Sequence, residues 1–270
     1  MDLLRRKHAP LAEEAWKLID EQAREVLAAN LSGRKIVDVV GPAGWGLSAV
    51  NLGRLEPGAA DAGDGVRYGI RKVLPLVEVR VPFRLDLWEL DNIGRGARDP
   101  DLVPLVAAVR TIAAFEEKAI YYGFPPAGIV GMADASAHAP IVLRDPRAYA
   151  EHVARGIVQL KKAGEGAGYA LVVGPALFEA LEGDSGGYPP RKQIEALLHG
   201  PILLSPFVDG GFLFPADSKD DFELAIGQDF SIGFEQHEGA KVRLFLTESF
   251  TFRVLEPLAV VPFRVEAPRA

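Results

Sequence analysis

The sequence predicts an α+β fold, because helix-like and strand-like patterns occupy different stretches of the chain. Apolar residues with a period of three to four mark helices near the N-terminus and through the middle, whereas the last third is a series of strands. Of the 270 residues, 49% are hydrophobic and 25% are charged. This apolar content is high for a soluble chain, so it predicts either a large core or apolar surface reserved for partner subunits.

The N-terminal part is predicted to form one helix and one short strand. Residues 10–31 carry apolar side chains at helical spacing, and Gly33 follows where helices commonly end. Residues 34–40 then alternate as a strand.

The next stretch is predicted to contain a projecting arm. Residues 41–69 are rich in Gly, Ala and Asp without a sustained period, and residues 66–88 are extended. Pro75 and Pro82 limit these strands to sheet edges or to the arms of a hairpin, since proline donates no hydrogen bond to a neighbouring strand. A hairpin of this kind has little core of its own, so we expect it to need a neighbour.

The middle of the chain is predicted to be mainly helical. The longest helix covers residues 101–123, and a second covers 145–162. The Gly-rich segment 164–168 leads into a buried strand. The remaining elements follow in the order strand 169–173, helix 176–181, loop 183–187 and helix 191–199.

The final third is predicted to be β-rich. Strands are expected at 202–208, 212–215, 222–234 and 242–265. The Asp209-Gly210-Gly211 sequence lies between two apolar runs, which is typical of a hairpin turn.

Composition argues against several function classes. The net charge of −7 disfavours nucleic-acid binding, which needs clustered cations. The absence of cysteine excludes disulfides and thiolate chemistry. No apolar run is long enough for a membrane helix, and the N-terminus lacks the apolar core of a signal peptide, so we expect a cytoplasmic protein without membrane or nucleic-acid partners.

The sequence shows no catalytic or metal-binding constellation. The five histidines do not share a metal-ligand spacing, and the P-loop and nucleophile-elbow motifs are absent. Gly164 to Gly168 follows a helix and precedes a strand, the reverse of a dinucleotide fingerprint. Carboxylates at Asp86, Glu89 and Asp91 and at Glu116-Glu117 are interpreted as salt bridges and solvated faces. We therefore expect no metal site and no enzyme activity.

Motifs spread over nearly the whole chain resemble the encapsulins, also called linocin-type bacteriocins. The resemblance is carried by Leu4-Arg5-Arg6, Gly33-Arg34-Lys35-Ile36-Val37-Asp38, Leu85-Asp86-Leu87-Trp88-Glu89-Leu90-Asp91-Asn92, Gly187-Tyr188-Pro189, Gly227-Gln228-Asp229-Phe230-Ser231-Ile232-Gly233 and Thr247-Glu248-Ser249-Phe250-Thr251-Phe252. Their common order along the chain makes the match far more specific than any one motif.

The resemblance implies the fold of the tailed-bacteriophage major capsid protein. In that fold an N-terminal helix and strand (1–40) precede an extended loop (41–88). A peripheral domain with a long spine helix would combine 89–135 and 222–270, and an axial domain would span 136–221.

The resemblance also implies a structural function. Copies would close into a hollow icosahedral shell, with sixty as the smallest number. The shell would enclose a dye-decolorizing peroxidase or a ferritin-like protein through C-terminal targeting peptides, for oxidative-stress or iron handling. The alternatives are a protease or bacteriocin activity and a phage major capsid protein. No cofactor is required, although some relatives bind a flavin.

A cargo-peptide site is implied on the inner wall, between the first helix and the β-rich segment. Its apolar floor would comprise Leu27, Leu31, Ile36, Phe230 and Ile232. Arg34, Asp38 and Asp229 would orient the peptide. Ordinary packing between helix and sheet is the competing interpretation of these residues.

Two further sites follow from the resemblance. A flavin would stack on Trp88, with Arg80 and Tyr188 nearby; as a side-chain type, Trp88 fits a core or interface anchor better. The rim of a five-fold pore would comprise Asp184, Ser185, Gly186, Gly187 and Tyr188. Its acidic character would favour cations such as ferrous iron.

Overall fold

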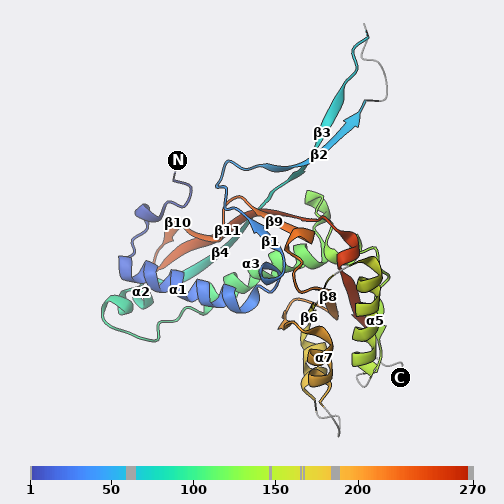
Figure 1. The fold of residues 1–270 in the computed structure, drawn as a ribbon. Coiled ribbons are helices and arrows are strands. Elements are labelled where there is room, and N and C mark those ends of the chain that lie inside the picture. Colours follow the sequence, from blue (N-terminus) through green and yellow to red (C-terminus); the bar gives the residue numbers. More distant parts are fainter. Residues whose placement is uncertain are drawn as a thin grey trace.

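A computed structural model describes residues 2–58, 65–145, 148–164, 166, 168–183 and 189–266. The chain forms two lobes, each built around a five-stranded sheet, and a two-stranded hairpin that projects away from both (Figure 1). The mixture of helices and sheets is consistent with the α+β fold that the sequence predicts.

The first sheet is centred on the long strand β11. It contains β1 (Asp38–Val40), β4 (Val77–Asp86), β9 (Phe222–Ile226), β10 (Ser231–Glu238) and β11 (Lys241–Val254). β4 pairs antiparallel along one side of β11. β10 and β9 pair antiparallel with successive parts of the other side, and β1 pairs parallel with β9. β4 and β10 are therefore both edges of this sheet.

Two helices are layered against the first sheet. The amphipathic α1 (Glu13–Asn30) packs on α3 (Val103–Tyr122), and α3 packs on β4 and β11. The short α2 (Leu87–Gly94) follows β4 and begins at Asp86, whose carboxylate accepts a hydrogen bond from the Trp88 N–H. The apolar faces of these elements form one continuous core, in which Ile19, Leu105 and Leu244 are completely buried.

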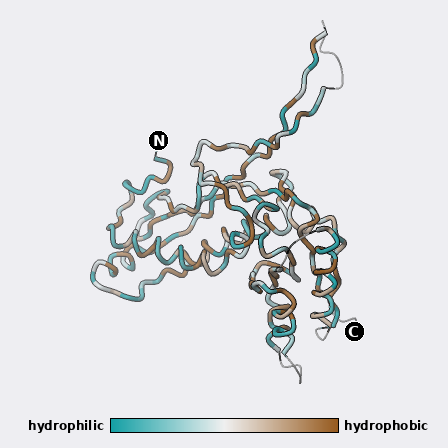
Figure 2. Tube along the Cα trace, viewed as in Figure 1, coloured by the Kyte–Doolittle hydropathy of each residue, from teal (hydrophilic) through white to brown (hydrophobic). Residues whose placement is uncertain are grey.

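The projecting hairpin is shorter than the arm expected from the sequence. It consists of β2 (Ala49–Pro57) and β3 (Gly69–Pro75), which pair antiparallel with each other only, among the described strands. β4 belongs to the first sheet instead, where Pro82 lies on an edge strand, as the proline rule requires. Figure 2 shows apolar positions along the hairpin as well as in the two lobes.

The second lobe is built on a mixed sheet in the order β5-β12-β8-β6-β7. Its strands are β5 (Ile141–Leu143), β6 (Tyr169–Val173), β7 (Ile202–Leu204), β8 (Gly211–Pro215) and β12 (Val261–Val265). The helices α5 (Tyr149–Ala163), α6 (Pro175–Glu182) and α7 (Pro190–Leu198) share a core with this sheet. α4 (Met132–Ala135) connects the lobes, and the described 3₁₀ turns are Arg6–His8, Gly33–Lys35, Pro125–Ala127, Lys219–Asp221 and Pro257–Ala259.

Two expectations about this lobe were wrong. Asp209-Gly210-Gly211 does not form a hairpin turn, because β6 lies between β7 and β8. The glycines serve close backbone approach instead: a Cβ on Gly210 would lie 2.2 Å from the carbonyl oxygen of Phe263. In addition, β12 leaves the first sheet region and pairs with β5 and β8, so residues 222–270 contribute to both lobes.

Candidate functional site

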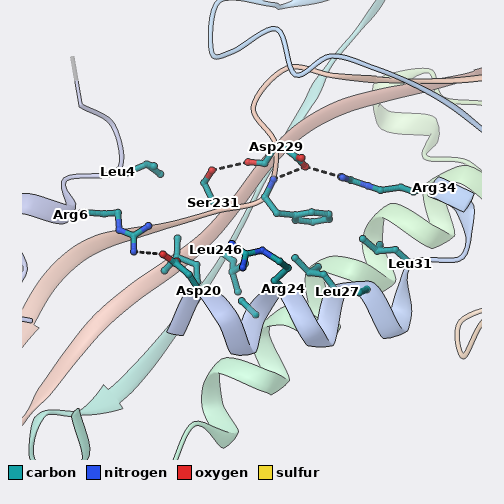
Figure 3. Close-up of a pocket in the computed structure, with 14 residues that line it drawn as sticks. Leu4, Arg6, Asp20, Arg24, Leu27, Leu31, Arg34, Asp229, Ser231 and Leu246 are labelled. Atoms are coloured by element: carbon teal, nitrogen blue, oxygen red, sulfur yellow. Dashed lines mark hydrogen bonds and ion pairs between the residues drawn. The ribbon is translucent and has the colours of Figure 1, made fainter. Parts of the chain in front are cut away.

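A groove with a volume of about 440 Å³ runs between α1 and β10 (Figure 3). Side chains from α1 form one wall, and the β9–β10 connection with the start of β10 forms the other. The N-terminal segment borders one end and Arg34 the opposite end. The residues that line it are Leu4, Arg6, Asp20, Ala23, Arg24, Leu27, Ala28, Leu31, Arg34, Asp229, Phe230, Ser231, Ile232 and Leu246.

One face of α1 supplies the helical wall. Asp20, Arg24, Leu27 and Leu31 recur at steps of three and four residues, which places them on the same side of a helix. The adjacent face carries Ile19, which is completely buried and packs into the core. The amphipathic pattern of α1 therefore presents one stripe to the core and an adjoining stripe to the groove.

The opposite wall is held in place by its own hydrogen bonds. The Gln228 side-chain amide donates to Ser231 Oγ at 2.8 Å, and Ser231 Oγ donates to the Asp229 carbonyl oxygen at 2.8 Å. The Gln228 N–H donates to Ser249 Oγ on β11 at 2.8 Å. These bonds fix the turn that presents the Phe230 ring to the groove.

Arg34 fixes one end of the groove by contacting three carboxylates. Its guanidinium donates to Glu116 on α3 at 2.7 Å, Glu248 on β11 at 2.5 Å and Asp229 at 2.9 Å. The same group lies over the Phe230 ring at 4.5 Å. Glu116 and Glu248 are completely buried, so Arg34 joins the groove wall to the interior of the lobe.

Burial and like charge raise the pKa of Glu248 well above its usual range. Desolvation is the largest cause, and the neighbouring Glu116 carboxylate adds to it. Arg34 opposes the shift without cancelling it. The shift favours the protonated form of Glu248, which lowers the negative charge that the three carboxyl groups place around Arg34.

The other end of the groove is closed by the N-terminal segment. The Arg6 guanidinium forms an ion pair with Asp20 at 2.7 Å and lies over the Trp16 ring at 4.0 Å. The Phe234 N–H on β10 donates to the Leu4 carbonyl oxygen at 2.8 Å. Leu4 thus lies beside the free edge of β10 and borders the groove.

Comparison with known proteins identifies the family. A family model described as "Encapsulating protein for peroxidase" matches residues 1–251. A type 1 encapsulin shell protein from Rhodospirillum rubrum is 41% identical over 98% of this chain and 97% of its own length. The chain belongs to the encapsulin shell protein family.

Solved structures show the same fold at low sequence identity. A virus-like particle from Pyrococcus furiosus matches this encapsulin with a TM-score of 0.61 and 15% identity, covering 91% of this chain and 98% of the other. The capsid of an empty GTA particle matches with a TM-score of 0.53 and 15% identity, covering 87% and 89%. The fold predicted from the resemblance, that of a phage capsid protein, is confirmed.

Six of the eight residues expected at the cargo-peptide site line the groove of the encapsulin chain. They are Leu27, Leu31, Arg34, Asp229, Phe230 and Ile232. Ile36 does not, because it is buried in the core that joins the two lobes. Asp38 does not either, because it lies on β1 opposite Glu223 of β9. Their peptide-binding role stays a prediction.

Sequence reasoning missed eight lining residues. These are Leu4, Arg6, Asp20, Ala23, Arg24, Ala28, Ser231 and Leu246. Helical spacing back from Leu27 could have found Arg24 and Asp20. Leu246 is the Cα partner of Ile232 in the β10–β11 ladder, a pairing that only the fold reveals.

The interpretation of Glu116-Glu117 as a solvated face was wrong. Both side chains are completely buried. Glu117 accepts hydrogen bonds from Ser32 Oγ at 2.5 Å, the Gly33 N–H at 2.7 Å and Ser205 Oγ at 2.8 Å. Desolvation raises its pKa, and these hydrogen bonds oppose the shift. The carboxylate therefore joins the end of α1 to α3 and to the second lobe.

Two of the three residues expected to bind flavin, Trp88 and Arg80, lie apart within the chain. Trp88 lies on α2 and is 72% exposed. Arg80 lies on β4 with its guanidinium over the Phe245 ring at 4.1 Å. Arg80 and Asp86 are separated by roughly 20 Å of extended strand. Tyr188, the third residue, lies outside the described residues, as does the whole expected pore rim, Asp184 to Tyr188.

Two further features are absent from the described part of the chain. It holds no group of three or more His, Asp or Glu side chains placed to bind a metal ion. None of its helices combines the length and hydrophobicity needed to cross a bilayer.

Proposed function

We propose that this chain assembles into a closed icosahedral shell of sixty copies in the cytoplasm and captures cargo enzymes through peptides bound in the α1–β10 groove. The groove is the observation that carries the cargo part of the proposal. The family description supports a peroxidase as cargo. A ferritin-like protein is the second cargo class that we propose, with oxidative-stress or iron handling as the role.

The projecting hairpin supports assembly. Leu55 is 60% exposed, Ile70 67% and Val73 52%. A hairpin with exposed apolar side chains and no partner among the described strands of its own chain is unstable in water, since two isolated strands bury too little surface. A neighbouring copy supplies the missing partner surface.

The shape and chemistry of the groove suit a peptide better than a small molecule. Its floor is apolar, and its polar groups lie at the two ends, at Arg24 on α1 and at Ser231 on the opposite wall. Apolar grooves of this kind bind peptides through a few anchor side chains. A shell with many such grooves gains effective affinity for cargo that carries several tails.

Assembly is tested by size-exclusion chromatography and negative-stain microscopy of the recombinant chain. We expect uniform hollow particles in the megadalton range. The variant L55S/I70S/V73S should remain folded by circular dichroism yet run as a monomer or small oligomer. V103S, which removes a 71% exposed side chain from α3, is the matched control and should assemble normally. A monomeric wild-type chain would refute the proposal.

Cargo capture is tested by co-expressing the shell with a fluorescent protein that carries the C-terminal tail of the peroxidase or ferritin-like protein encoded beside this chain. We expect fluorescence in the particle fraction. L27D should abolish it without preventing assembly, because Leu27 is partly buried at the groove rather than inside the core. Equal loading of L27D and wild-type shells would exclude this groove as the cargo site.

A further inference from the structure

The free edge of β10 next to the groove has unused backbone hydrogen-bonding groups. In an antiparallel pair, the N–H and C=O of one residue point to the same side, and this side alternates along the strand. The Phe234 N–H donates to Leu4, away from β11. Ile232 lies two residues earlier in the regular part of the ladder, so its N–H and C=O also point away from β11, toward the groove.

The N-terminal segment already uses this edge, but only at one position. The Leu4 carbonyl accepts from Phe234, and no described residue outside the sheet hydrogen-bonds to the backbone of Ile232. Leu4 therefore covers one position of the edge and leaves the adjacent one facing the groove. An extended segment that enters the groove would continue along β10 from the point where Leu4 stops.

Arg24 is the second unused group. Arg6 pairs with Asp20, and Arg34 pairs with Asp229 and the two buried glutamates. Arg24 projects from α1 into the groove (Figure 3), is exposed, and has no carboxylate within ion-pair distance in the described part of the chain. The two groove-lining carboxylates, Asp20 and Asp229, are already paired with other arginines. The groove thus has an unpaired cation at its centre.

We propose that the groove binds its guest as an extended strand added to the free edge of β10, and that Arg24 binds a carboxylate of that guest. This rests on the proposed function and specifies the partner. Main-chain bonds to Ile232 would position the guest, and every second side chain would point into the apolar floor, since side chains alternate along a strand. The carboxylate could belong to an acidic side chain or to the C-terminus.

A proline scan tests the strand. A fluorescent protein with the designed tail Leu-Ser-Val-Ser-Leu-Ser-Val-Asp-Gly-Gly competes against a second-colour protein with the same unmodified tail, and both are co-expressed with the wild-type shell. Proline removes the backbone N–H at one position of the tail. Within the tail segment that lies along β10, every second N–H would bond to β10. At these alternate positions proline should reduce loading about 5- to 10-fold, the equivalent of one backbone hydrogen bond. Alanine at the same positions keeps the N–H, so uniform loss, or equal loss for proline and alanine at every position, would overturn the strand.

A charge exchange tests Arg24. With the wild-type shell, the Asp tail should outcompete the same tail with Asn about 5- to 10-fold, as a charge-assisted hydrogen bond at an open site predicts. R24Q should remove this preference, and R24E should favour a tail with Lys. A third tail that ends at the final Val distinguishes a terminal carboxylate from an acidic side chain.

The outcomes separate this proposal from the function on which it rests. If the natural tail loads but the designed tail does not, or if R24Q keeps the preference for Asp, the proposal fails while cargo capture stands. If no tail loads, both fail. If empty R24E particles do not assemble while R24Q particles do, Arg24 pairs with a neighbouring copy and the proposal is overturned.

Discussion

Removal of the buried Glu117 carboxylate should destabilise the fold far more than removal of an exposed one. The carboxylate accepts three hydrogen bonds, from Ser32, Gly33 and Ser205. E117A leaves the Gly33 N–H and the Ser205 hydroxyl without their acceptor, and a buried unsatisfied donor costs about 1–3 kcal/mol. Relief of the desolvated carboxylate offsets part of this, so we expect a loss of about 3–5 kcal/mol.

The conservative substitution should cost less, because it preserves part of the network. In E117Q the amide oxygen still accepts from the Gly33 N–H, and the amide nitrogen can donate to the Ser32 and Ser205 hydroxyls after they rotate. Ser32 Oγ also lies 2.8 Å from the Tyr121 hydroxyl, so it keeps a partner. We expect a loss of about 1–2 kcal/mol.

The assay is thermal unfolding of assembled particles at one scan rate. At about 2–4 °C per kcal/mol for chains near this size, E117A should lower the midpoint by roughly 6–20 °C and E117Q by roughly 2–8 °C. E21A is the control, since Glu21 is exposed and lies 3.9 Å from Lys17. It should change the midpoint by no more than about 1–2 °C. Equal midpoints for E117A and E21A would refute the role of the buried network.

Three other predictions concern protonation, backbone space and flavin. The pKa of Glu248 is higher in the folded than in the unfolded chain, so the side chain stabilises the fold fully below its unfolded pKa. This contribution is lost as the pH rises toward the folded pKa. In thermal scans from pH 5 to 9, E248Q should therefore become more stable relative to wild type. E238Q should show no such trend, because its pKa of about 2 lies below this range. G131A should destabilise strongly, since its Cβ would lie 2.2 Å from the Gly123 backbone nitrogen, whereas G94A meets nothing within 4 Å and should be neutral or slightly stabilising. If a flavin stacks on Trp88, purified particles should show its visible absorption and W88A particles should lose it; colourless wild-type particles would exclude a resident flavin.

Regular elements with a clear hydrophobic period were predictable from the sequence, whereas the irregular strand β2 was not. The three main helices and the buried strand β6 each carry an uninterrupted pattern. β2 contains an irregularity between Asn51 and Arg54, where the Asn51 side chain accepts a hydrogen bond from the Gly53 N–H. Leu52 and Gly53 have no partner on β3 at this point, and Gly53 adopts a φ of 66°, so the segment shows no sustained period and was predicted to be irregular.

The same limit applies to the groove. The floor residues of the groove were predicted from the sequence because they lie in motifs that resemble a known family. The burial of Glu116 and Glu117 was not predictable, because it depends on which face of α3 meets the sheet. Apolar side chains surround both glutamates in the helix, and a charged pair in such a pattern is normally solvent-exposed. Only the partners on distant segments, Arg34 and Ser205, explain why these two carboxylates are buried.

The groove and the core are built from the same packing, and this decides which substitutions can test function. Ile232 and Leu246 line the groove but are also buried members of the core under α1 and α3. A polar side chain at either position would disturb the packing of α1 on α3 and remove the groove wall at the same time. Leu27 is only partly buried and Arg24 is exposed on the stripe of α1 that faces the groove, so changes there should alter guest binding while the shell still assembles. A loss of loading at Ile232 would therefore say nothing about peptide recognition, whereas the same loss at Arg24 in an intact particle would.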